Sequence, residues 1–91
     1  MATPAEVKND MAAHAAYWHR RDKRIFRACN DAAKVIAMYL DGSQVDGRTY
    51  WGLRRRLLDL SSPTSRTPVA GAPNFDRALT TLQTLNAEAD R

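Results

Sequence analysis

Residues 4–41 read PAEVKNDMAAHAAYWHRRDKRIFRACNDAAKVIAMYLD, and they contain the strongest structural pattern of this 91-residue chain. Apolar side chains recur in this segment at steps of three and four residues, which places them in one sector of a helical wheel at about 100° per residue. The pattern predicts an amphipathic helix with one continuous apolar face. Its members are Val7, Met11, His14 or Ala15, Trp18, Ile25, Cys29, Ala32 or Ala33, Ile36 and Leu40.

The sequence marks both ends of this helix. Thr3 can accept a hydrogen bond as the N-cap, Pro4 suits the first helical position, and Gly42 suits a C-terminal stop. The segment between Pro4 and Gly42 contains neither glycine nor proline, although Asp22 interrupts the apolar face near residues 20–24. We therefore predict a long first helix, continuous or mildly kinked, of about 55 Å at 1.5 Å per residue. A break near 20–24 is the alternative, because a helix of that length exceeds a compact domain of this size.

The remainder of the chain predicts two shorter helices separated by a loop. Residues 42–47 form a turn in which Asp46 can cap a helix from about 48 to 60. Residues 61–73 contain three prolines and no helical period, which predicts a mobile Pro/Ser/Thr loop, and Asn74 can cap a last helix. The apolar faces of these helices consist of Tyr50, Leu53, Leu57 and Leu60, and of Phe75, Leu79, Leu82 and Leu85.

Together these patterns predict an all-α fold. We expect a single helical domain over residues 1–91, built as a small bundle of three main helices with the first at about 4–41. The apolar face of that first helix is longer than two short helices can cover. A homodimer formed through the first helix is therefore a further expectation.

The chain is basic, and its positive charge is unevenly distributed. It contains 14 Lys and Arg residues against 10 Asp and Glu residues, which gives a formal net charge of +4. Residues 1–60 contain eleven basic and seven acidic side chains, whereas residues 61–91 contain three of each. Five basic residues lie within 20–27, where Asp22 is the one acidic residue. Such a cluster suits phosphate groups or an acidic protein surface.

The first candidate partner-binding surface is the basic side of the predicted long helix. On a continuous helix, four basic side chains project from the side opposite the apolar face. They can contact phosphates or carboxylates of a partner, and the alternative is an ordinary solvated helix face. These residues are Arg20, Lys23, Arg24 and Arg27.

The second candidate surface lies on the helix predicted at about 48–60. Trp51 and Leu58 fall outside the apolar face of that helix and have arginines beside them. Tryptophan and arginine are the side chains most enriched at binding hot spots, and Trp51 and Arg55 are spaced for stacking of the guanidinium on the indole. The alternative is that Trp51 enters the core. The predicted contact residues are Trp51, Arg54, Arg55 and Leu58.

The sequence contains no pattern typical of a metal, cofactor or catalytic site. Cys29 is the only cysteine, and its place on the apolar face predicts a small buried residue without a disulfide partner in the chain. This fits a reducing cytoplasm, and neither a signal peptide nor a membrane span is expected. His14 and His19 are about 140° apart around a helix and do not converge on a metal. We therefore expect no metal, no cofactor, no membrane partner and no catalytic residue.

These observations favour a small non-enzymatic binding protein. We expect it to associate stoichiometrically with a larger protein or nucleoprotein, as an adaptor or inhibitor. Its size, its charge and its lack of catalytic motifs are those of phage-encoded anti-defence proteins, including inhibitors of CRISPR complexes. Two alternatives stay open. One is a small basic regulator that binds DNA alone with a steep salt dependence, and the other is a structural or assembly protein that self-associates.

Overall fold

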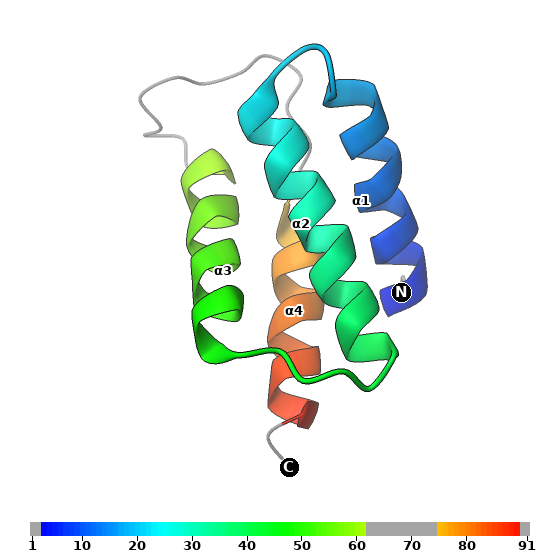
Figure 1. The fold of residues 1–91 in the computed structure, drawn as a ribbon, viewed down its shortest axis with the longest axis vertical. Coiled ribbons are helices and arrows are strands. Elements are labelled where there is room, and N and C mark those ends of the chain that lie inside the picture. The colour runs from blue at the N-terminus through cyan, green and yellow to red at the C-terminus, as the bar shows by residue number, and fades with distance from the viewer. Residues whose placement is uncertain (1–2, 62–74, 90–91) are drawn as a thin grey trace.

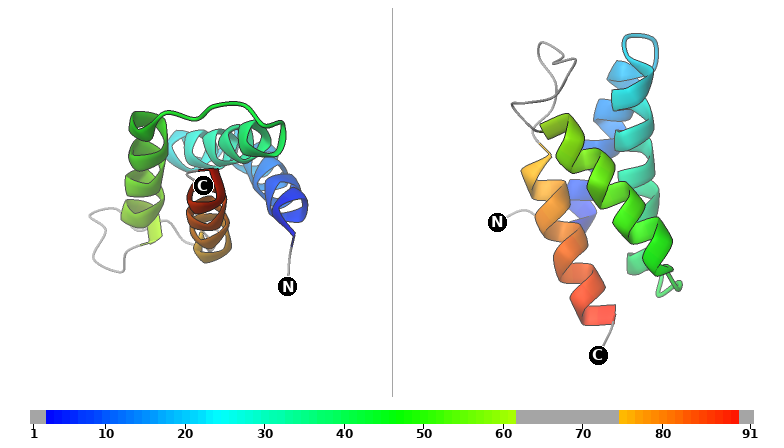
Figure 2. Two further views of the ribbon diagram at one scale, coloured as in Figure 1. Left: turned by 90° about the horizontal axis from the view of Figure 1, so that it is seen from below. Right: turned by 90° about the vertical axis from the view of Figure 1, so that its left-hand side faces the viewer.

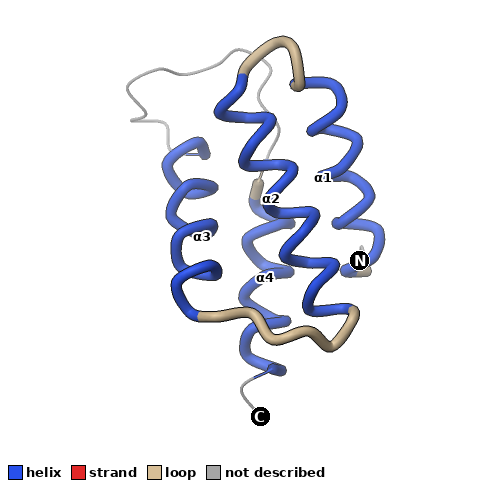
Figure 3. The backbone as a smooth tube through the Cα atoms, in the orientation of Figure 1, coloured by secondary structure: helices blue, strands red, loops and turns tan. Residues whose placement is uncertain are grey.

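The regular structure of the chain is helical throughout its described part. The computed structural model describes residues 3–61 and 75–89, and these two ranges contain no strand. The prediction of an all-α fold is confirmed, whereas the prediction of three main helices is wrong, because there are four in these ranges (Figures 1 and 3). The helices are α1 (Pro4–Trp18), α2 (Lys23–Leu40), α3 (Gly47–Ser61) and α4 (Asp76–Ala89).

The preferred prediction of a continuous first helix over residues 4–41 is wrong, and the alternative of a break near 20–24 is confirmed, because the chain turns between α1 and α2. The backbone carbonyl of Trp18 accepts hydrogen bonds from the N–H groups of Arg21 at 3.0 Å and of Asp22 at 3.1 Å. Asp22 is extended and forms the N-cap of α2, where its carboxylate accepts from the N–H groups of Arg24 at 2.9 Å and Ile25 at 3.4 Å. An aspartate at this position satisfies donors that the start of a helix leaves unpaired. The interruption of the apolar face is therefore the start of a second helix.

The hairpin of α1 and α2 buries the two halves of the predicted apolar face against each other. The predicted members from Val7 to Ile36 are buried, apart from His14 and Ala33, which are half-buried. Leu40 is the exception, with 45% of its surface exposed. Leu40 is the last residue of α2, which has 18 residues and packs against the 15-residue α1. The last turn of α2 therefore extends past the end of α1. Because the hairpin covers this face within one chain, the reason for expecting a homodimer through the first helix no longer holds.

The other two helices complete the bundle around this hairpin. Seen along the bundle, α3, α2 and α1 form an arc, and α4 fills its open side (Figure 2). α4 contacts all three of the other helices, whereas α1 and α3 do not touch within the described residues. Four residues were predicted to form the apolar face of the last helix. Phe75, just before α4, and Leu82 are buried, and Leu79 and Leu85 are half-buried. The buried side chains form one cluster drawn from every helix.

The predicted helix ends are confirmed at three places. The Thr3 hydroxyl accepts from the N–H of Glu6 at 3.2 Å, and the Asp46 carboxylate accepts from the N–H of Thr49 at 2.7 Å. Gly42 has a φ of 78°, a left-handed conformation that favours glycine after a helix. Apart from Ser61, which ends α3, the predicted loop at 61–73 lies outside the described residues, and so does Asn74.

Replacing Asp22 by alanine tests the cap that turns the chain. Asp22→Ala is expected to lower the free energy of unfolding by about 1 kcal/mol at neutral pH, because two N–H groups lose their acceptor. The hydrogen bond from the Arg24 side chain is the main effect that holds the pKa of Asp22 below its usual value; burial opposes it, and the backbone N–H groups of Ile25 and Arg24 lower the pKa further. A lowered folded-state pKa means that this stabilisation is present above the usual aspartate pKa of about 4 and is lost as the pH falls through the lower folded-state pKa.

The control for this prediction is Asp41→Ala at the opposite end of α2. A carboxylate at a helix C-terminus opposes the helix dipole, so its removal is expected to leave stability unchanged or slightly higher. Urea denaturation followed by circular dichroism measures both variants. Equal losses of stability in the two variants would contradict the assignment of Asp22 as the cap.

Cys29 provides a test of the core. Burial raises the pKa of the Cys29 thiol to about 11, so thiol reagents are expected to label the native protein slowly at neutral pH. Cys29→Ala is expected to lower the free energy of unfolding by about 1 kcal/mol through lost packing. Cys29→Ser is expected to be less stable still, because the buried hydroxyl needs a hydrogen-bond partner. Labelling of the native protein as fast as that of the unfolded protein would show that the site is open to solvent.

Candidate functional site

The predicted basic surface at residues 20–27 does not form one helix face. Arg20 lies in the turn between α1 and α2, and only the other three residues belong to α2. Arg24 is held by the Asp22 carboxylate, with its Nη2 at 3.2 Å from Oδ2. Lys23 and Arg27 are exposed, and Lys34, seven residues after Arg27, extends their row along α2. The prediction of a single basic helix face is wrong because the chain turns at Asp22.

Trp51 lies on the surface, so the alternative that it enters the core is wrong. Its exposed fraction is 59%, and that of Leu58 is 41%, whereas Tyr50, Leu53 and Leu57 take the core side of α3 with at most 3% exposed. Consecutive residues of a helix point about 100° apart, so burial of Tyr50 turns the Trp51 indole outward. Trp51 and Leu58 are seven residues apart and share one edge of α3. They form the apolar part of the second predicted surface.

The exposed Trp51 indole has two side-chain neighbours, Tyr50 and Arg54. The Tyr50 ring packs against it edge to face at a centroid distance of 5.2 Å, and a Cβ atom at Gly47 would lie 4.0 Å from its Cδ1. The Arg54 guanidinium lies 5.3 Å from the ring centroid. The expectation that Arg55 stacks on the indole is therefore wrong, because Arg54 takes that place. Both arginines can reach the ring by their spacing, and the half-buried Arg54 is the one that lies over it.

An ion pair between α2 and α3 fixes which edge of α3 faces α2. Arg56 Nη2 lies 2.6 Å from Asp31 Oδ2. Trp51 and Leu58 are about 140° and about 160° around the helix from Arg56, at 100° per residue. They are thus on the edge away from α2. The two surfaces predicted from the sequence are separate, and the structure does not join them.

Positive charge is concentrated on two neighbouring helices. α2 and α3 each contain four basic side chains and one acidic one, whereas α1 and α4 each contain one basic and two acidic side chains. α2 and α3 lie side by side with opposite directions (Figures 1 and 2). Asp31, the acidic residue of α2, is already paired with Arg56. The side of the bundle formed by α2 and α3 is therefore the cationic side.

Gly52 is an unusual feature of this cationic side. It is exposed near the middle of α3, and a Cβ atom at this position would have no neighbouring heavy atom within 4 Å beyond its own stretch of helix. Arg48 precedes it by one turn, and Arg55 and Arg56 follow it by one turn. Gly52, Arg48 and Lys34 are not among the partner-binding residues predicted from the sequence. A glycine inside a helical pattern with arginines at −4, +3 and +4 was the available signal.

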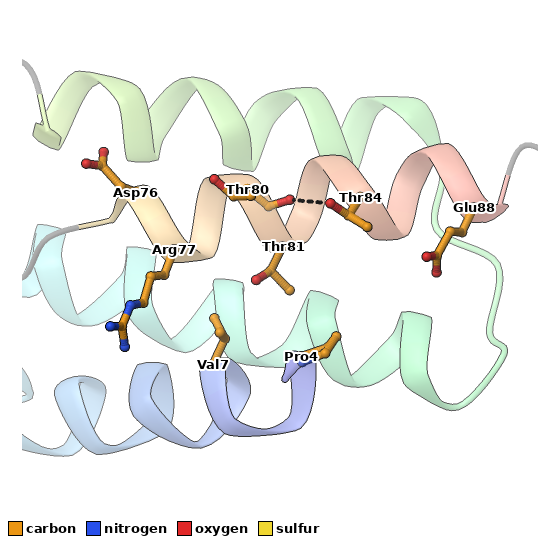
Figure 4. Close-up of a pocket in the computed structure, with 8 residues that line it drawn as sticks. All are labelled: Pro4, Val7, Asp76, Arg77, Thr80, Thr81, Thr84 and Glu88. Atoms are coloured by element: carbon orange, nitrogen blue, oxygen red, sulfur yellow. Dashed lines mark hydrogen bonds between the residues drawn. The ribbon is translucent and has the colours of Figure 1, made fainter. Parts of the chain in front are cut away.

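An open groove lies between α1 and α4. It has a volume of about 520 Å³ and contains three threonines of α4 (Figure 4). The Thr84 hydroxyl donates to the Thr80 carbonyl at 3.0 Å, so this hydroxyl is used within the helix. Asp76 and Glu88 lie at opposite ends of the groove, about 18 Å apart along α4 at 1.5 Å per residue, and do not form a carboxylate pair.

The histidines and carboxylates do not gather at one place. Within residues 3–61 and 75–89, no group of three His, Cys, Asp or Glu side chains is placed to hold a metal ion. The exposed His19 ring packs edge to face on Phe26 at a centroid distance of 4.7 Å. No helix in the same two ranges is long and apolar enough to cross a membrane.

Gly52→Ala tests how open the surface of α3 is. The substitution is expected to raise the free energy of unfolding by about 0.5–1 kcal/mol, because alanine loses less backbone entropy in a helix and its methyl group meets no neighbour. The control is Gly42→Ala, which is expected to lower stability because position 42 has a positive φ. Urea denaturation measures both. A destabilised Gly52→Ala protein would contradict the open surface.

Comparison of the chain with protein-family models, with curated proteins and with solved structures finds no match. Function is therefore inferred from the side chains themselves. The surface of α3 combines the exposed Trp51 and Leu58 with four basic side chains, and the basic row of α2 lies beside it.

Proposed function

We propose that this protein is a non-enzymatic adaptor or inhibitor that associates stoichiometrically with a larger protein or nucleoprotein through α3. The observation that carries the proposal is the exposed apolar edge of α3, where Trp51 is 59% and Leu58 is 41% exposed at positions i and i+7. Two large apolar side chains on one exposed edge of a helix offer a partner a continuous surface to bury. Burial of these side chains by a partner therefore yields much of the favourable free energy of binding.

The spacing of the exposed residues favours a groove in the partner. Trp51, Arg55 and Leu58 stand at positions i, i+4 and i+7 of α3, the spacing of helices that bind in an apolar groove. Trp51 and Leu58 fill such a groove, and Arg55 lies at its rim. The basic excess of α3 favours a groove with acidic residues around it.

The same charge disfavours a second copy of the chain as the partner on this surface. A symmetric dimer through α3 places Arg48 and Arg55 of one copy near those of the other. Like charges across an interface are destabilising. A larger heterologous partner is thus the better fit.

A phage-encoded inhibitor of a CRISPR complex is one role with this combination of small size, positive charge and helical docking surface. We place the action of the protein in the cytoplasm, where a single free cysteine used as a core residue is ordinary. The cationic side formed by α2 and α3 supports a nucleoprotein as the partner, because nucleoproteins expose both apolar grooves and phosphates.

Trp51→Ala tests the proposal against Tyr17→Ala. Both residues are exposed aromatic side chains with an arginine over the ring, Tyr17 on α1 and Trp51 on α3. Tagged wild-type protein is used to isolate its partner from cells of its source, and titration calorimetry then gives stoichiometry and affinity. Trp51→Ala is expected to weaken binding by about 2 kcal/mol or more, and Tyr17→Ala by less than about 0.5 kcal/mol. Both variants should keep the wild-type circular dichroism spectrum.

Equal affinity of wild type and Trp51→Ala for the isolated partner would remove α3 from the mechanism. Turnover of any substrate by the isolated protein would overturn the non-enzymatic assignment.

A further inference from the structure

We propose that α3 binds the phosphate backbone of duplex DNA at Gly52, between Arg48 and Arg55 of α3 and Lys34 of α2. These four residues are called the glycine site below. The inference goes beyond the proposed function, because it assigns a ligand class to the basic stretch of α3 between the Trp51 edge and the edge that faces α2. Of the protein-docking residues, Trp51 and Leu58 lie outside the glycine site, and Arg55 borders both surfaces.

The surface at Gly52 allows a ligand to approach the helix closely. Gly52 has no side chain, and the space where a Cβ atom would point is empty to 4 Å. Glycine in the middle of a helix is unfavourable for stability, and close approach of another backbone is one of its established uses. No packing contact within the described residues requires a glycine here. The missing side chain therefore fits a ligand better than it fits the needs of the bundle.

Arginines stand on both sides of this bare position. Arg48 lies four residues before Gly52 and Arg55 three residues after it, so both neighbour it on the helix surface. Both are exposed. Two guanidinium groups can thus reach one phosphate above Gly52 from opposite directions, each with parallel N–H donors that match phosphate oxygens.

Lys34 brings a third positive charge from α2. The ion pair between Arg56 and Asp31 sets the level at which α2 and α3 meet. Lys34 lies three residues after Asp31, and Gly52 lies four residues before Arg56. α2 and α3 run in opposite directions (Figure 1). Both steps therefore lead the same way along the bundle, which brings the exposed Lys34 to about the level of Gly52.

None of these three cations forms an ion pair within the described residues, and the one acidic neighbour is the Asp46 carboxylate, whose charge attracts that of Arg48. The ion pairs of the described residues join Arg24 to Asp22 and Arg56 to Asp31, and neither pair involves a residue of the glycine site. Asp59 is the acidic residue of α3. It lies seven residues from Gly52, about 10 Å along the helix at 1.5 Å per residue.

The arrangement of the cations favours duplex DNA over a small anion. The row on α2 continues from Lys34 to Arg27 and Lys23, and packed helices lie about 8–10 Å apart. Two cationic rows at that separation can meet the phosphates on either side of one DNA groove, since the minor and major grooves are about 6 and about 12 Å wide. The surface is open, which suits a polymer with repeated charges.

The test measures binding of a fluorescein-labelled duplex of about 20 base pairs by fluorescence anisotropy, over a salt series from about 50 to about 200 mM. Lys34→Glu and Arg48→Glu are each expected to weaken binding about tenfold and to reduce the salt slope by about 1. Arg77→Glu on α4 makes the same change in net charge on another side of the bundle and is expected to weaken binding less than threefold.

Gly52→Ala is the decisive variant, because it changes no charge. It is expected to weaken duplex binding at least fivefold while raising the melting temperature, so loss of folding cannot explain the result. Trp51→Ala is expected to keep wild-type duplex binding, which separates the glycine site from the protein-docking surface.

Two results would overturn the proposal. One is a lack of binding that depends on the glycine site: either the wild type does not bind the duplex, or Gly52→Ala or Lys34→Glu binds it as tightly as the wild type does. The other is binding of a labelled poly-glutamate peptide as tight as that of the duplex, which would identify the glycine site as a protein contact. Either result leaves the Trp51-dependent association with a larger partner standing.

Discussion

The reversal of the chain at Asp22 is the constraint on which the rest of the bundle depends. It allows the two halves of the apolar face to cover each other, and the hydrogen bonds that the Asp22 carboxylate accepts mark where α2 starts. The reversal brings Trp18 and Ile25 into one core, where a continuous helix would hold them about 10 Å apart along its axis. It also places α2 between α1 and α3, which leaves one open side for α4 to fill.

The surface of α3 follows from this arrangement. α3 contacts α2 and α4 and does not touch α1 within the described residues, so one side of it is sufficient for the core. Tyr50, Leu53 and Leu57 occupy that side, and the ion pair from Arg56 to Asp31 directs a second edge towards α2. Trp51 is left on the remaining edge. Its exposure is thus a consequence of helical phase combined with the position of α3 at one end of the arc.

Helical periodicity predicted most of the core but could not predict the turn. The steps of three and four residues correctly identified Val7, Ile25 and Leu57 as buried, because the phase of a helix face does not depend on where the helix ends. The same property hid the break. Trp18 and Ile25 are seven residues apart, close to two full turns, so a continuous helix and a hairpin give them the same phase. Whether Asp22 is an interruption or a cap is decided by what covers the apolar face, which is a tertiary property.

The candidate site shows a similar limit of local reasoning. Trp51 was placed off the main apolar face by its phase, but its ring can be reached from Arg54 and from Arg55 by spacing alone. The choice of Arg54 depends on its half-buried position. Lys34 and Gly52 lie at a similar height along the bundle because α2 packs beside α3. Spacing along the sequence does not reveal this packing. Because one rigid helix carries both edges, Trp51 and Gly52 stand about 100° apart at a fixed separation. A partner that offers an apolar groove beside a DNA backbone can engage both edges at once, and the second contact then forms without a further loss of translational freedom. Under the two proposals above, DNA alone engages the glycine site and leaves Trp51 free, whereas a nucleoprotein engages both.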